Sequence, residues 1–203
     1  MAERVIVLVH GIHTSQKRAK TWMQALDNYL DSRHSGNLDV RKFMYGWISG
    51  FSIRFPFVGY WTRHHYVRKF QKFIEKIVKE KGNDVIIDVV CHSFGTYITH
   101  FSMTFDSSRR AKAFFNRIVY MGGIVSAREN FKNEEGHFKQ ALNLWSGGDD
   151  VIRIAPFGHS GYRGFNNADG EVVINKDMTP FNHNDYTMYG NAWPLIYEFL
   201  SQA

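Results

Sequence analysis

Continuous apolar runs alternate along the chain with segments in which apolar residues recur at helical spacing. The apolar runs lie at residues 4–9, 85–90, 117–121 and 141–146, and residues 38–45 alternate between apolar and polar side chains. Largely apolar runs of this length, of which the one at residues 5–9 is uninterrupted, are typical of strands buried on both faces of a parallel sheet. The pattern therefore predicts a mostly parallel central sheet.

Helical periodicity separates and follows these strands. Apolar residues share one helical face over residues 22–30, 66–78 and 192–200. Strands alternating with helices along the chain are typical of an α/β fold, in which helices cover both faces of the sheet. A chain of 203 residues is long enough for one such unit. We expect a single domain over residues 1–203, without a large cap domain.

Composition and charge narrow the class of protein. Hydrophobic residues make up 44% and charged residues 22%, as in ordinary globular proteins. The apolar run at the N-terminus is too short for a signal peptide, and a single cysteine cannot form an internal disulfide, so we expect a cytoplasmic protein. The net charge of +6 suits an anionic partner. Nucleic acid is not expected, because no zinc-finger, RNP or helix-turn-helix pattern is present.

The segment "DVVCHSFGTY" (residues 88–97) places a serine where a predicted strand passes into a helix. A tight strand–turn–helix junction with Ser93 at its apex and Gly95 two residues later is typical of a nucleophile elbow. The residues two before and two after the apex are expected to lie against each other, so both must be small. Cys91 stands where glycine is usual, and we interpret it as a small packing residue. The alternative nucleophile is Cys91 itself, although its sulfur would point into the sheet.

An elbow serine requires two backbone donors that hold the oxyanion. The amide of Phe94, directly after the serine, is one candidate. The loop "HGIHTS" after the first strand supplies the other, because Gly11 permits close approach, Ile12 offers its amide and His13 lies beside it. We interpret His10 and His13 as a hydrogen-bonded loop pair, since no third ligand follows at the spacing of a metal site. No metal is predicted.

A carboxylate and a histidine would complete the machinery of a serine nucleophile. The segment "ALNLWSGGDDVI" follows a strand with a turn that carries Asp149 and Asp150. Asp149 is favoured because the apolar pattern resumes soon after it, and Asp150 is the alternative. For the histidine, His183 lies between the last predicted strand ("EVVI") and the final helix, and is favoured over His159.

Ser93, Asp149 and His183 follow one another in this order, with "HG" after the first strand and "HNDY" before the last helix. In these features the chain resembles the α/β-hydrolase superfamily over essentially its whole length. Within it, the lipase/esterase branch is most similar, including inositol-deacylase-like and triacylglycerol-lipase-like proteins. The resemblance implies a serine hydrolase of carboxylic esters with acyl or lipid-like groups, which forms an acyl-enzyme and requires no cofactor. The alternatives are an amidase or thioesterase with the same triad, or a non-catalytic binding scaffold.

Residues 40–74 contain no Asp or Glu but hold seven Arg and Lys side chains and eleven aromatic residues. Within this span, residues 46–65 are too apolar for a freely solvated loop. We interpret them as a small lid or pocket wall that contacts an anionic lipid surface through its arginines. The alternative is a connection packed against the protein's own core or against a dimer partner. The sequence does not predict the oligomeric state.

Overall fold

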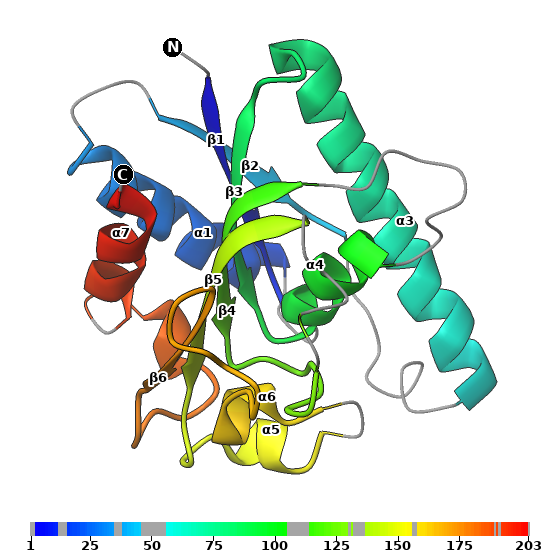
Figure 1. Cartoon of the computed structure of the whole chain (residues 1–203), viewed down its shortest axis with the longest axis vertical. Coiled ribbons are helices and arrows are strands. Elements are labelled where there is room, and N and C mark those ends of the chain that lie inside the picture. The colour runs from blue at the N-terminus through cyan, green and yellow to red at the C-terminus, as the bar shows by residue number, and fades with distance from the viewer. Residues whose placement is uncertain are drawn as a thin grey trace.

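A single parallel sheet forms the centre of the molecule, as Figure 1 shows for the computed structural model. The structure describes residues 3–11, 16–34, 38–45, 56–104, 114–129, 131, 137–155, 158–188, 190 and 192–202, with the backbone alone for 16–18 and 56–62. The strands are β1 (Arg4–Val9), β2 (Asp39–Phe43), β3 (Ile86–His92), β4 (Phe115–Met121), β5 (Phe138–Trp145) and β6 (Val173–Asp177). Their order is β2-β1-β3-β4-β5-β6, and every neighbouring pair is parallel.

Helices cover both faces of this sheet, which confirms the predicted α/β architecture. Two helices, α1 (Gln16–Asp31) and α7 (Trp193–Ser201), pack on one face, and α3 (Pro56–Lys81) and α4 (Phe94–Thr104) pack on the other. Strand β1 contributes to both layers, because Val5, Val7 and Val9 face α3 and α4 while Ile6 and Leu8 face α1 and α7. Burial on both faces explains why the strand is continuously apolar.

The longest helix begins earlier than the sequence pattern suggests. Helix α3 starts at Pro56 rather than near Tyr66, and proline is favoured in the first turn because its missing N–H is not needed there. The second half of the stretch 46–65 is therefore helical, whereas residues 46–55 lie outside the described part of the chain. Among the described residues, no helix has both the length and the apolar composition needed to cross a membrane.

The order of the strands creates a switch point next to β1. The chain passes from β1 through α1 to β2 on one side, and then through α3 to β3 on the other side of β1. Register aligns Val9 with Cys91, and His92 with Met121, so the chain leaves β1, β3 and β4 at one edge of the sheet. In open α/β sheets, ligands bind at the carboxyl ends of the strands where the connections diverge in this way. The loops at this edge carry the residues described next.

Candidate active site

Ser93 occupies the sharp turn between β3 and α4. Its φ of 55° makes it the one residue other than glycine with a positive φ in the described part of the chain. Such a backbone conformation costs about 1–3 kcal/mol and persists only when neighbouring groups hold it. The Ser93 N–H donates to the Met121 carbonyl at 3.0 Å, and the Ser93 carbonyl accepts from the Thr96 hydroxyl at 2.6 Å. These bonds fix the turn and present the hydroxyl at the carboxyl end of β3.

Two glycines allow the backbone to approach this turn closely. A Cβ at Gly95 would lie 2.7 Å from the carbonyl oxygens of both Val9 and His10. A Cβ at Gly11 would lie 2.7 Å from the Cβ of Ser93. Gly95 is therefore small because β1 crosses beside it. The three atoms nearest to a Cβ at this position belong to Val9 and His10, so the chain at the end of β1 limits the size of residue 95.

Cys91 lies in the apolar layer beneath α3 and α4. Its side chain is fully buried, and its S–H donates to the Val119 carbonyl at 3.2 Å. Burial raises the pKa of the thiol well above its usual range, so the sulfur stays protonated. A buried, protonated thiol is a poor nucleophile.

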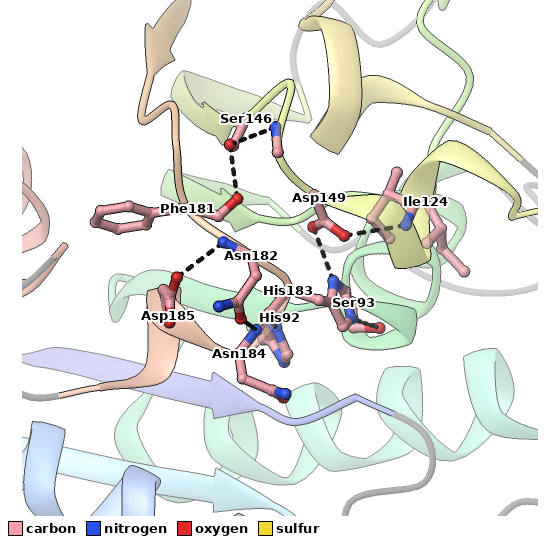
Figure 2. Close-up of polar contacts among 12 residues, drawn as sticks. His92, Ser93, Ile124, Ser146, Asp149, Phe181, Asn182, His183, Asn184 and Asp185 are labelled. Atoms are coloured by element: carbon pink, nitrogen blue, oxygen red, sulfur yellow. Dashed lines mark hydrogen bonds and ion pairs between the residues drawn. The ribbon is translucent and has the colours of Figure 1, made fainter.

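His183 lies between Ser93 and Asp149, as Figure 2 shows. Its Nε2 is 2.8 Å from the Ser93 Oγ, and its Nδ1 is 2.9 Å from the Asp149 Oδ2. A carboxylate can only accept, so Nδ1 carries the proton and Nε2 accepts from the Ser93 hydroxyl. Asp149 is fully buried, and its Oδ1 accepts from the Ile152 N–H at 3.0 Å as the N-cap of α5 (Asp150–Arg153). The three side chains form an unbroken chain of hydrogen bonds.

The alternative acid and base lie outside this chain. The side chain of Asp150 is 79% exposed and pairs with Arg153 at 3.2 Å. His159 precedes the short helix α6 (Ser160–Arg163), and its side chain makes no capping bond to that helix. It is Asp149 and His183 that the structure brings to Ser93.

The loop that carries His183 is attached to the turn after β5. The Ser146 hydroxyl donates to the Phe181 carbonyl at 2.7 Å and accepts from the Gly148 N–H at 3.0 Å. A Cβ at Gly148 would lie 2.9 Å from the Pro180 carbonyl oxygen, so this turn and the loop are in direct contact. The predicted pair of glycines after the β5 strand thus places Asp149 beside the loop of His183.

Gly122 is a residue of the site that the sequence pattern did not single out. Its φ is 53°, and a Cβ there would lie 3.1 Å from both the Asp149 Oδ2 and the His183 Nδ1. A side chain at this position would disturb the pair. The Gly-Gly dipeptide after the predicted strand 117–121 could have identified this residue in the sequence. Glycines in or beside strands often mark places where another segment of the chain or a ligand approaches the backbone closely.

Of the two residues whose amides were predicted to hold the oxyanion, the structure describes Phe94 only. Phe94 is the first residue of α4, so its amide lies at the helix N-terminus next to Ser93. Ile12 and His13 lie outside the described residues. His10 pairs with the backbone: its Nδ1 donates to the Gly11 carbonyl at 2.6 Å, and its Nε2 accepts from the Tyr45 N–H at 3.4 Å.

These bonds engage both ring nitrogens of His10, and burial lowers its pKa, so the ring is neutral and has no free nitrogen for a metal. In the described part of the chain, no group of three or more His, Cys, Asp or Glu side chains is arranged to hold a metal ion.

Comparison with known proteins gives a fold. No family model matches the sequence, and no curated protein matches it. The structure is similar to the lin2722 gene product of Listeria innocua, with a TM-score of 0.65, 10% identity and coverage of 99% of this chain and 95% of that one. It is also similar to an alpha/beta hydrolase superfamily protein from Xanthomonas campestris (TM-score 0.55, 12% identity, 97% of each chain). A cutinase-like protein from a Cryptococcus species has a TM-score of 0.54 at 13% identity, over 98% of this chain and 93% of that one. The chain thus has the α/β-hydrolase fold.

Proposed function

We propose that the protein is a serine hydrolase that cleaves carboxylic esters through an acyl-enzyme. The observation that carries this proposal is the hydrogen-bond chain from Ser93 through His183 to Asp149, at distances of 2.8 and 2.9 Å. The strained φ of Ser93 supports it, because such strain is characteristic of nucleophiles at an elbow. The ester class rests on the resemblance to lipases and esterases.

In the first step, the Ser93 Oγ attacks the carbonyl carbon of the ester while its proton passes to the His183 Nε2. The ring becomes an imidazolium, and the buried Asp149 carboxylate stabilises it through the Nδ1–H. Because Asp149 also accepts from the Ile152 N–H, its orientation is fixed before the reaction begins. Fixed dipoles of this kind lower the barrier without a reorganisation cost.

The negative charge on the carbonyl oxygen requires donors beside Ser93. The amide of Phe94 is the first donor, and it lies at the positive end of α4. The amide of Ile12 is the proposed second donor, because the preceding residue, Gly11, lies so close to Ser93 that a Cβ there would be 2.7 Å from the Ser93 Cβ. His183 then gives its proton to the leaving alcohol. Water repeats the same steps on the acyl-enzyme and releases the acid.

Labelling with a fluorophosphonate tests this proposal most directly, because the reagent reacts only with an activated serine. We expect one adduct, located by mass spectrometry on Ser93 and absent from Ser93→Ala. Ser32→Ala is the matched control, since the Ser32 hydroxyl donates to the Tyr29 carbonyl at the end of α1 and should not affect labelling. Folding of each variant is checked by circular dichroism.

Turnover then defines the bond that is cleaved. p-Nitrophenyl esters of increasing acyl length are compared with the corresponding anilide and thioester. Faster cleavage of the oxygen esters supports the proposed class, whereas preference for the anilide or the thioester would replace it with an amidase or thioesterase. A folded protein that forms no adduct on Ser93 would instead favour a binding scaffold without catalysis.

A further inference from the structure

His92, the residue directly before Ser93, makes a contact that the proposed reaction does not use. Its Nε2 is 2.8 Å from the backbone carbonyl oxygen of His183, and both residues appear in Figure 2. A carbonyl oxygen only accepts, so the His92 Nε2 carries a proton and donates it. The side chain of one residue of the elbow thereby holds the backbone of the loop that carries the base.

The ring of His92 is itself held by its surroundings. It is 5% exposed, and its centroid lies 4.7 Å from that of the His183 ring. Trp22 of α1 and Tyr186 each pack with a ring centroid 6.4 Å away. Gly11 also lies close to the ring, because a Cβ at that residue would be 3.4 Å from the His92 Nδ1. Few rotamers are open to a ring enclosed in this way, so the donor has a defined direction.

We propose that His92 is a positioning residue that sets the distance between the base His183 and the nucleophile Ser93. The backbone of His92 is bonded directly to Ser93, while its side chain holds the carbonyl of His183, a residue 91 positions away in the chain. One side chain thus links the nucleophile directly to the backbone of the base. A second, longer link to the same loop runs through Ser146 and the turn after β5. The inference rests on the proposed function of these residues.

The bond from His92 does not depend on pH where the reaction would occur. Burial, with the neighbouring rings of His183 and His10, lowers the pKa of His92 to about 3. The other side chains packed against the ring, Trp22 and Tyr186, carry no charge, because burial raises the pKa of the Tyr186 hydroxyl. The neutral ring therefore donates throughout the range in which a catalytic imidazole changes charge.

Two variants whose new side chains are equally long distinguish a role of His92 in positioning His183 from a role in packing. In His92→Gln, the side-chain amide nitrogen lies the same number of bonds from Cα as the His92 Nε2 and can donate to the same carbonyl. In His92→Met, the side chain has the same length but no donor. We expect His92→Met to lower the rate of fluorophosphonate labelling by at least about 10-fold, and His92→Gln to keep it within about 3-fold of the wild type. Thermal unfolding of the two variants should agree closely.

A second readout does not require turnover. The proton on the His183 Nδ1, bonded to Asp149, should give a far-downfield signal in the proton NMR spectrum of the wild type and of His92→Gln. In His92→Met, we expect this signal to broaden or vanish.

Equal labelling in the two variants, whether both are impaired or both are normal, would overturn the proposal. If wild-type Ser93 is not labelled, the proposed function fails, and the NMR comparison alone decides whether His92 positions His183: an unchanged signal in His92→Met overturns it.

Discussion

Two buried aspartates, Asp88 and Asp149, lie toward opposite ends of the sheet and have different partners. Asp88 is near the amino end of β3, where it accepts from the Arg4 Nε at 2.5 Å and from the Asn116 Nδ2 at 2.8 Å. Asp149 follows β5 at the carboxyl end, where it accepts from the His183 ring and from a backbone N–H. Both carboxylates are fully buried and hydrogen-bonded, so burial alone does not distinguish them.

The two aspartates differ in the side chain with which each is paired, a guanidinium for Asp88 and an imidazole for Asp149. A guanidinium stays charged at all accessible pH values, so the pair of Asp88 and Arg4 cannot pass a proton. Arg4 and Arg117 also donate to the Leu200 carbonyl near the end of α7, a favourable place for positive charge. An imidazole, by contrast, gains and loses a proton near neutral pH. The ion pair at the amino end can therefore contribute only to cohesion, whereas the hydrogen bonds at the carboxyl end would permit the proton transfer that we propose.

The largest effect on activity is expected at the carboxyl end. Asp149→Asn should lower the rate of Ser93 labelling by about 10⁴-fold, because an amide no longer holds the required tautomer of His183. Asp150→Asn is the matched control and should stay within about 3-fold, since its side chain is largely exposed and pairs with Arg153. Equal losses in the two variants, or the reverse order, would remove Asp149 from the proposed triad.

Asp88→Asn should affect stability and leave the site intact. Removing the buried carboxylate from its pair with the partly exposed Arg4 should lower the free energy of unfolding by about 3 kcal/mol, the lower end of the range for breaking a buried ion pair. For a chain of this size, the melting temperature should fall by about 6–12 °C. Labelling per folded molecule should not change. Glu80→Gln is the control, because its exposed pairs with Arg41 and Lys76 should contribute less than about 1 kcal/mol. Lost labelling in a folded Asp88→Asn protein would contradict the separation of roles.

The smallest effect on activity is expected for His159, a histidine that also lies among the loops at the carboxyl end of the sheet. His159 follows β5, as Asp149 does, but it takes no part in the hydrogen-bond chain. His159→Ala should keep labelling within about 2-fold, whereas His183→Ala should lose nearly all of it. The rates are compared at the same pH and under conditions in which both variants are folded. Abolition by His159→Ala would transfer the role of base to that residue.

Local patterns in the sequence predicted the architecture, which the structure confirms, and Ser93 as the candidate nucleophile. The continuous apolar run of β1 followed from burial on both faces, and the junction of strand and helix at Ser93 is a property of consecutive residues. The order of Ser93, Asp149 and His183 along the chain carries the resemblance to the α/β-hydrolase superfamily. The strand and the elbow each depend on neighbours in the chain, so periodicity and turn chemistry are sufficient to predict them.

Which side chains become hydrogen-bond partners was decided by the tertiary structure alone. The bonds of His183 to Asp149 and to Ser93 join residues 34 and 90 positions apart. The apolar pattern after the turn favoured Asp149 over Asp150, but only the folded chain shows which carboxylate meets the histidine. The same holds for Asp88, which is one polar residue in an apolar run until the sheet places Arg4 beside it. His92 and Gly122 acquire their contacts only when the segments after β4, β5 and β6 meet at the end of β3. Sequence specifies which groups are available, while the packing of loops on the parallel sheet determines which of them meet.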